Sequence, residues 1–247
     1  MAKYYKNTVG FDGWRFDYVK SFHPRFVKAW MDEVGGWAVG EFFDGNANLI
    51  RSWMAESGTK AFDFPCLFTM QSAFAANNLN ALTDGDMLWK TNPNEAVTFV
   101  ANHDTDREPV IANDFKSLAY AFILTHPGYP TIFYLDIENN RFRRELENLI
   151  LIKRTLALGG FEVLYVDGNE YIALRGGNAK SPGLVIYMNL GDSLASRPVK
   201  TSWNDSYLAD YSKNINGLVK SGTDGNATLF APANSYAIWS VNAIGNR

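Results

Sequence analysis

The 247-residue sequence contains a single cysteine, Cys66, which excludes an internal disulfide. It has no apolar run long enough to cross a membrane, and no cluster of Lys and Arg of the kind that binds nucleic acid. The formal net charge is only −3, and 47% of the residues are hydrophobic. These values are typical of a soluble globular protein with an ordinary core.

The sequence also lacks internal repeats, low-complexity tracts and a long linker. Residues 1–7 lack the apolar region of a secretory signal. We therefore expect a cytoplasmic location by default, or export together with a partner that carries a leader. Aromatic residues are abundant, at 15%, which suits either a sugar-binding surface or a dense core.

Residues 10–20 contain an alternating pattern that predicts a strand. The aromatic residues at alternate positions in Trp14–Tyr18 would share one face, while Arg15 and Asp17 would share the other. The guanidinium group would keep the Asp17 carboxylate ionised and oriented. A carboxylate nucleophile needs both properties. Taken alone, the stretch is equally compatible with a structural ion pair that closes a strand.

Acidic residues follow two further apolar strands. Glu41 ends the strand 37–39, and Asp104 follows the strand 96–100. Helix-like stretches lie between the three strands. An acid at the C-terminal end of each strand is typical of a parallel barrel or sheet whose chemistry lies at one rim.

Three motifs carry a resemblance to a known family. GFDGWRFD at 10–17, GE at 40–41 and FVANHD at 99–104 resemble the second, third and fourth shared motifs of the α-amylase family, glycoside hydrolase family 13. WAVGE and VTFVANHDTD are most similar to archaeal, heat-adapted members. The resemblance implies retaining, endo-acting hydrolysis of α-1,4-glucosidic bonds in starch- or glycogen-type glucans. It implies Asp17 as nucleophile, Glu41 as acid/base and Asp104 as stabiliser of the transition state.

The same resemblance implies roles for four further residues. Arg15 and His103 would contact the substrate, and Lys20 would contact the sugar on the leaving-group side. The backbone carbonyl of Ser21 would bind a calcium ion shared with a partner chain. The first family motif, with its Asp and His, is absent, as is the His that often follows the lysine. This chain alone is therefore expected to be inactive or nearly so.

The residues around the two acids also suggest that Glu41 is the general acid and Asp17 the nucleophile. Aromatic and aliphatic residues around Glu41 should raise its pKa, as a general acid requires, whereas Arg15 should keep Asp17 ionised. A retaining enzyme would place the two carboxyl groups about 5–5.5 Å apart. Gly40 would allow close approach of the substrate. The alternative for Glu41 is a carboxylate that caps the next helix.

Several aromatic and polar residues need a choice between a functional and a structural interpretation. The adjacent His103 and Asp104 could form half of a metal site, but no second His or Cys lies nearby at ligand spacing. Trp89 lies in a polar stretch, and we expect it to stack on a sugar ring. Trp14 should belong to the core.

Five strand-helix units are expected between residues 14 and 158, the last of them with a strand at 131–134. From Phe161 the hydrophobic period changes to two, with a hairpin turn at Gly168 and Asn169. The predicted fold is therefore α/β, with units 4–8 of a TIM (β/α)8 barrel in residues 1–160. A small antiparallel β-sandwich domain would follow in residues 161–247.

Five units cannot close an eight-stranded barrel, which needs about 250 residues in total. The open sheet would leave two apolar edges exposed. We therefore expect a second chain, an N-terminal half-barrel with strands 1–3, to complete a split α-amylase. An inactive fragment is the alternative.

Two alternative functions use the same residues. A 4-α-glucanotransferase would employ the same three acids and yield products longer than its substrate. A glucan-binding subunit, inactive on its own, would carry the acids as remnants. The presence of all three acids together with Arg15 and His103 favours an enzyme.

Overall fold

The computed structural model describes residues 1–242 and divides the chain into two compact units. The first consists of Met1–Thr69, Gly85–Phe99 and Pro127–Thr131. The second consists of Met70–Asp84, Val100–His126 and Ile132–Arg247.

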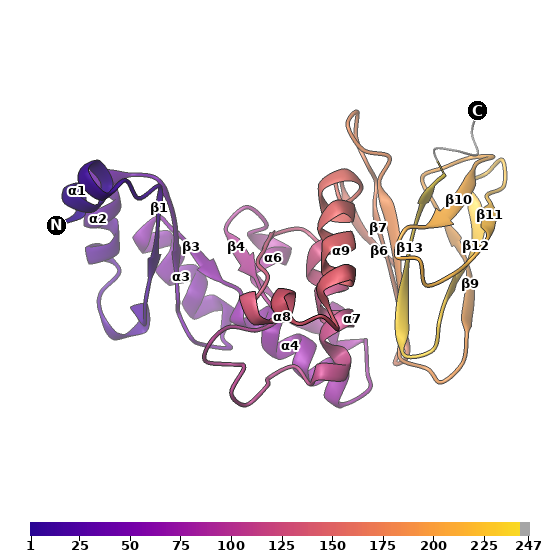
Figure 1. Ribbon diagram of the computed structural model, residues 1–247, viewed down its shortest axis with the longest axis horizontal. Helices are drawn as coiled ribbons and strands as arrows, with labels where there is room; N and C mark the ends of the chain where they lie inside the picture. The colour runs from indigo at the N-terminus through magenta and orange to yellow at the C-terminus, as the bar shows by residue number, and fades with distance from the viewer. Residues whose placement is uncertain (243–247) are drawn as a thin grey trace. The chain divides into compact units, whose positions relative to one another are not determined.

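A parallel sheet of five strands forms the centre of the first unit (Figure 1). The strands lie in chain order: β1 (Gly13–Phe16), β2 (Trp37–Gly40), β3 (Lys60–Phe62), β4 (Ala96–Thr98) and β5 (Tyr129–Pro130). Because all neighbours are parallel, their C-terminal ends lie along one edge of the sheet. This edge carries Asp17 and Glu41, as the sequence pattern predicts.

Short and medium helices connect the strands. They are α1 (Ala2–Tyr4), a π-helical turn (Tyr5–Val9), a 3-10 turn (Val19–Ser21), α2 (Arg25–Val34), α3 (Ala47–Ser57), α4 (Phe64–Ala75), α5 (Ala81–Asp84) and α6 (Leu88–Thr91). The Asn46 side chain caps α3 by accepting hydrogen bonds from the backbone of Asn48 (3.0 Å) and Leu49 (3.4 Å). Gly58 ends the same helix with a φ of 70°.

Tryptophan side chains of α2 and α3 pack on the sheet. The rings of Trp14 and Trp30 meet edge to face with centroids 5.4 Å apart, so Trp14 belongs to the core as expected. A Cβ atom on Gly40 would lie 2.1 Å from the Trp53 ring. Gly40 is thus required by the packing of α3 on β2, a role that the sequence did not indicate.

The second unit contains helices and two antiparallel sheets. A 3-10 turn (Asn113–Phe115) precedes α7 (Lys116–Thr125), which is followed by α8 (Tyr134–Glu138) and α9 (Arg143–Thr155). The strands are β6 (Phe161–Val166), β7 (Glu170–Arg175), β8 (Leu184–Asn189), β9 (Ala195–Lys200), β10 (Tyr207–Asp210), β11 (Leu218–Lys220), β12 (Asn226–Ala231) and β13 (Ser235–Val241). The six-stranded sheet has the order β11-β10-β13-β8-β7-β6, and β12 pairs with β9.

The β strands enclose one apolar core, whose largest side chains are Trp239, Tyr187 and Trp203. The β6–β7 hairpin turns between Val166 and Glu170, which confirms the turn expected at Gly168 and Asn169. The antiparallel β architecture predicted from the period-two pattern is therefore confirmed.

The strand predicted at 131–134 is wrong. β5 ends at Pro130, and after it only Thr131 continues the pairing, by donating its N–H to the Thr98 carbonyl at 2.8 Å. Tyr134 instead begins helix α8. The residues of this stretch favour a strand, but contacts with residues distant in sequence outweigh that preference. One of them is the hydrogen bond that the backbone N–H of Phe133 donates to the Tyr120 hydroxyl (3.3 Å).

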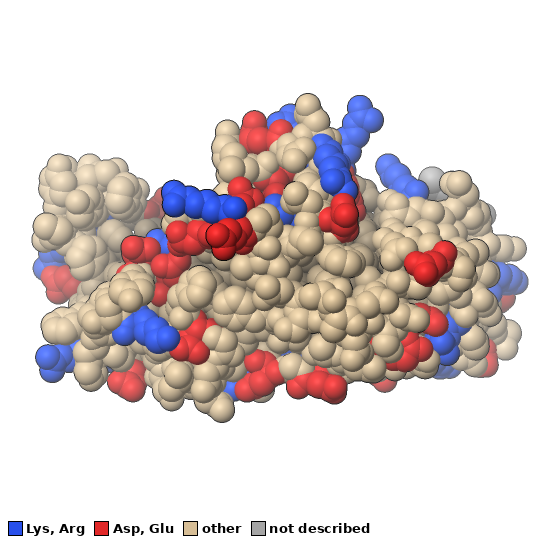
Figure 2. All heavy atoms as spheres, turned by 90° about the horizontal axis from the view of Figure 1, so that it is seen from below, with Lys and Arg blue, Asp and Glu red and all other residues tan. Residues whose placement is uncertain are grey.

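No helix among residues 1–242 has the length and apolar character needed to span a membrane. On the face shown in Figure 2, basic and acidic side chains are interspersed. That distribution agrees with the small net charge of −3.

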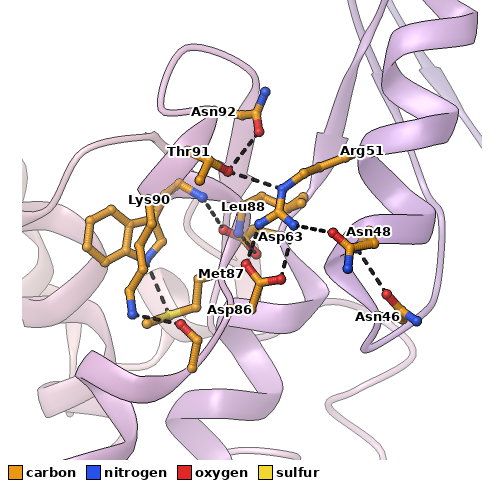
Figure 3. Close-up of polar contacts among 12 residues, drawn as sticks. Asn46, Asn48, Arg51, Asp63, Asp86, Met87, Leu88, Lys90, Thr91 and Asn92 are labelled. Carbon is orange, nitrogen blue, oxygen red and sulfur yellow. Dashed lines mark hydrogen bonds and ion pairs between the residues drawn. The ribbon is translucent and has the colours of Figure 1, made fainter.

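A buried carboxylate connects the region after β3 with α6. Asp63 Oδ1 accepts hydrogen bonds from the backbone N–H groups of Cys66 (3.0 Å) and Leu88 (3.1 Å), and Oδ2 accepts one from Trp89 (2.9 Å) (Figure 3). Burial raises the pKa of Asp63 to about 6, although these three donors act in the opposite direction. No local pattern in the sequence predicted this role.

We expect Asp63→Asn to lower the free energy of unfolding by about 1–3 kcal/mol at pH 4. The reason is that Asp63 is protonated at this pH, and its hydroxyl oxygen can still accept a hydrogen bond from a buried N–H, whereas an amide nitrogen in its place cannot. Denaturant unfolding would measure the loss. Asp84→Asn, at an exposed position of α5, is the matched control and should change stability by less than about 0.5 kcal/mol.

The difference between Asp63→Asn and wild type should also depend on pH. Because the pKa of Asp63 is about 6 in the folded state and about 4 in the unfolded state, the folded protein binds more protons between these values. Wild-type stability should therefore fall by up to about 3 kcal/mol as pH rises from 4 to 6. The variant should lack this component, so a constant difference across the window would contradict the assignment.

Candidate active site

The C-terminal ends of β1 and β2 continue to pair beyond the strands themselves. Glu41 donates its N–H to the Phe16 carbonyl (2.9 Å), and Val19 donates its N–H to the Glu41 carbonyl (3.1 Å). The register that aligns Phe16 with Gly40 thus continues for one more residue. Asp17 and Glu41 are consequently neighbours at the sheet edge, as the strand pattern predicts.

Arg15 contacts both acids. Its Nη1 lies 2.5 Å from Asp17 Oδ1, and its Nη2 lies 2.7 Å from Glu41 Oε1. The first contact is a hydrogen bond and confirms the predicted pair. The second is an electrostatic contact without hydrogen-bond geometry. The sequence alone did not indicate that one guanidinium group would serve both carboxyl groups.

Glu41 is buried, whereas Asp17 is exposed. Burial raises the pKa of Glu41, and the neighbouring Asp17 raises it further by a hydrogen bond and by its charge. The Tyr18 N–H and the Arg15 charge act in the opposite direction. The raised pKa expected from the apolar surroundings of Glu41 is confirmed, with burial as the largest cause.

Tyr18 has a role that the sequence analysis missed. It was expected to continue the strand face of Trp14 and Phe16, which is wrong, because its φ of 45° turns the chain out of the strand. This turn directs the Tyr18 N–H toward Glu41 Oε2 at 3.3 Å. A left-handed backbone at a bulky residue is unfavourable and occurs often at functional sites. No local sequence signal marks it.

Lys20 and Ser21, for which the resemblance implies contacts with sugar and calcium, lie on the 3-10 turn that follows β1. The Lys20 ammonium group binds Asp44 Oδ2 at 2.6 Å, and this hydrogen bond lowers the pKa of Asp44. Ser21 donates its hydroxyl to the Tyr18 carbonyl at 2.9 Å. Asp44 was not predicted as a partner of Lys20.

His103 and Asp104 belong to the second unit, in the segment that follows β4. A turn built on Asn102 holds them, since Asn102 Oδ1 accepts the N–H groups of Asp104 (3.0 Å) and Thr105 (2.9 Å). His103 Nε2 lies 3.3 Å from Asp104 Oδ2, and both side chains are exposed. The expected His-Asp pair is therefore present.

Trp89 does not provide a stacking surface. Its side chain is 4% exposed, its backbone N–H binds Asp63, and its indole N–H donates to the sulfur of Met87 at 3.3 Å. The predicted sugar-binding role is wrong, because the polar stretch around Trp89 folds into the short helix α6, which turns this ring into the core.

Among residues 1–242, no three His, Cys, Asp or Glu side chains gather as a metal-binding group. Ser21 offers one backbone oxygen, whereas calcium takes six to eight oxygen ligands.

Comparison with known proteins finds similarity to α-amylases. Residues 184–240 match the family described as Alpha-amylase C-terminal. The cytoplasmic alpha-amylase of Escherichia coli is 26% identical over 98% of this chain and 56% of its own length. The chain is α-amylase-like.

Solved structures support the same architecture. The alpha-amylase of Anoxybacillus superposes with a TM-score of 0.78 at 18% identity, over 98% of this chain and 62% of that chain. CldA, a cyclomaltodextrin glucanotransferase, superposes with a TM-score of 0.74 at 21% identity, over 98% of this chain and 60% of that chain. At these identities the likeness concerns the fold.

The α-amylase-like chain spans about half the length of the curated relatives it matches, 56% of one and 50% of another. Curated relatives similar to this chain include proteins of Escherichia coli, a Bacillus strain and Arabidopsis thaliana. They do not support the archaeal, heat-adapted type expected from the motifs.

Proposed function

We propose that this chain carries the acid pair of a retaining, endo-acting α-1,4-glucan hydrolase. Asp17 would be the nucleophile and Glu41 the acid/base. The arrangement of Arg15 between the two carboxyl groups carries the proposal. One guanidinium group holds the exposed Asp17 in place, while burial favours a protonated Glu41.

Each group would contribute a separate step. Glu41 would protonate the glycosidic oxygen as Asp17 attacks the anomeric carbon and forms a covalent glycosyl intermediate. Deprotonated Glu41 would then activate water to release the sugar. Asp104, held by the Asn102 turn, would bind sugar hydroxyl groups more strongly in the transition state, with His103 beside it.

A retaining mechanism requires two carboxyl groups close together, whereas an inverting one leaves space for water between them. The hydrogen bond and the charge by which Asp17 raises the pKa of Glu41 support the close arrangement. Proton NMR of the first products from maltoheptaose tests this directly. Retention predicts α-anomers, and β-anomers would refute the assignment of Asp17.

We further propose that polypeptide outside residues 1–247 completes the barrel. β1 is an edge strand, and exposed aromatic side chains lie near it in the sequence, at Phe11, Tyr18, Phe22 and Phe26. Calcium would then be bound by the Ser21 carbonyl together with oxygens from that polypeptide. Light scattering would give the mass of the active species and so decide between a longer chain and a second chain such as a half-barrel subunit.

Transfer to another glucan is the second candidate reaction. The same acids would serve it, and the fold is shared with a cyclomaltodextrin glucanotransferase. Products longer than maltoheptaose would indicate transfer. Shorter products alone would indicate hydrolysis.

Arg15→Met should move the alkaline limb of the pH profile. Since the guanidinium group lowers the pKa of Glu41, its removal should raise that pKa further and move the limb of kcat/KM to higher pH. Activity should also fall, because Asp17 loses its orienting partner. Arg25→Met, at an exposed position of α2, is the matched control. A shift of the alkaline limb to lower pH would contradict the conclusion that the Arg15 charge lowers the pKa of Glu41.

A further inference from the structure

A cavity of about 500 Å³ lies in the first unit, at the end of the sheet opposite the acid pair. Trp37 begins β2 and Lys60 begins β3, and both line it. Asp17 and Glu41 follow the other ends of β1 and β2. The cavity is therefore separate from the candidate active site, and its size is ordinary for a small-molecule site.

One wall is a guanidinium group held in a fixed position. Arg51 binds the Asp86 carboxylate through both terminal nitrogens, one of them at 3.0 Å (Figure 3). It also donates to Asn48 Oδ1 (2.9 Å) and to Thr91 Oγ1 (3.1 Å). Thr91 in turn donates to Asn92 Oδ1 at 2.9 Å, and Asn92 lines the same cavity. These polar groups are thus preorganised before any ligand binds.

A second cation, Lys60, also lines the cavity. The Lys60 ammonium group donates to the Asn94 carbonyl at 2.9 Å and lies 4.9 Å from the centroid of the Tyr129 ring. The carboxylate of Glu95 lines the cavity as well. The lining therefore combines donors and acceptors at fixed positions.

Most of the remaining lining is apolar. The Trp37 side chain is 44% exposed, and Met31 and Met54 lie on the helical side. An indole ring offers an apolar face for the C–H groups of a sugar, while the polar wall can bind its hydroxyl groups. A pyranose ring has both kinds of surface.

The charges around the cavity disfavour an anion. Asp86 offsets the charge of Arg51, and the carboxylate of Glu95 adds a negative charge to the lining. The C-terminal ends of α2 and α3 lie at the cavity, marked by Gly36 and Gly58. Helix C-termini carry partial negative charge. A neutral polyhydroxylated ligand fits this field better than a phosphate or carboxylate does.

We propose that this cavity is a second glucan-binding site, which holds a glucosyl segment away from the acid pair. The choice of glucan among neutral sugars rests on the proposed function. The chemistry of the wall itself requires only an uncharged sugar. Such a site would hold a long glucan on the protein between cleavage events.

Calorimetric titration of the 247-residue chain with maltoheptaose tests the proposal, with all variants made in an Asp17→Asn background to prevent cleavage. Trp37→Ala should abolish one binding site or weaken it at least about tenfold, as expected for the loss of one stacked ring. Trp37→Phe should restore binding to within about threefold. Tyr207→Ala is the matched control, because Tyr207 is exposed and lies beside Lys220 in the β domain.

Unchanged maltoheptaose binding in Trp37→Ala would overturn the proposal, as would tighter binding of inorganic phosphate than of maltoheptaose. Absence of any site sensitive to Trp37 in a chain with native circular dichroism would also overturn it. Failure of the proposed function is distinguishable. In that case the protein with a complete barrel and an intact Asp17 releases no product from maltoheptaose, while the Trp37-dependent sugar site remains.

Discussion

Asp17→Asn should lower kcat for α-glucan hydrolysis by a factor of about 10³ or more, measured as reducing ends released from maltoheptaose by the protein with a complete barrel. An amide is a poor nucleophile and carries no charge to stabilise an oxocarbenium-like transition state. The substitution is nearly isosteric, and Asp17 is exposed, so folding should be preserved. KM should change much less than kcat, because the loss arises in the transition state.

The same variant should affect its neighbour. Asp17 raises the pKa of Glu41 by a hydrogen bond and by charge, so removal of the charge should lower that pKa. The alkaline limb of the residual activity should then move to lower pH, opposite to the shift expected for Arg15→Met. Substitutions at positions 15 and 17 would thus shift the pKa of Glu41 in opposite directions.

Glu41→Gln should reduce kcat by about 10²–10⁴, since the general acid is lost while the nucleophile remains. Asp32→Asn is the matched control for both variants, because Asp32 also forms an ion pair, with Lys28 on the exposed side of α2. Activity of Asp17→Asn within a factor of two of wild type would eliminate the hydrolase proposal. It would leave a glucan-binding subunit as the remaining interpretation.

The acid pair could be predicted because local patterns determine it. A strand pattern aligned Arg15 with Asp17, and a second strand ended at Glu41. Parallel pairing then made Asp17 and Glu41 neighbours. The raised pKa of Glu41 also followed from adjacent apolar residues, as the burial of its side chain bears out.

The failures have a common physical cause, which is contact between residues far apart in sequence. Trp89 lies in a polar stretch, but the buried Asp63 binds its backbone from 26 positions away. Gly40 precedes a candidate catalytic acid, but its small size serves the Trp53 ring of α3. The backbone of Tyr18 leaves its strand through a conformation that its side chain does not favour. None of these contacts has a local signature.

A buried ion pair in the second unit provides the largest expected effect on stability. Lys116, the first residue of α7, is almost wholly buried and lies 2.6 Å from the buried carboxylate of Asp136. The Tyr120 hydroxyl donates to the other Asp136 oxygen at 2.6 Å, and burial together with this carboxylate raises the pKa of Tyr120. Asp106 lies 3.4 Å from the same ammonium group. The sequence showed only the start of an apolar helix here.

Lys116→Met should lower the free energy of unfolding by about 3–5 kcal/mol, because it leaves the charge of Asp136 buried without its cation. For a chain of this size the melting temperature should fall by roughly 6–20 °C, measured by calorimetry. Lys28→Met is the matched control. It breaks an exposed pair with Asp32 and should cost at most about 1 kcal/mol.

A second substitution separates the ion pair from simple packing of the lysine side chain. If the uncompensated carboxylate causes the loss, Lys116→Met/Asp136→Leu should recover most of it, since two apolar groups can replace a buried pair at little cost. The Tyr120 hydroxyl would then lose its acceptor, so full recovery is not expected. A double variant less stable than Lys116→Met alone would show that Asp136 stabilises the fold through Tyr120 rather than through Lys116. Equal decreases in the free energy of unfolding in Lys116→Met and Lys28→Met would show that the buried pair stabilises the fold no more than the exposed pair does.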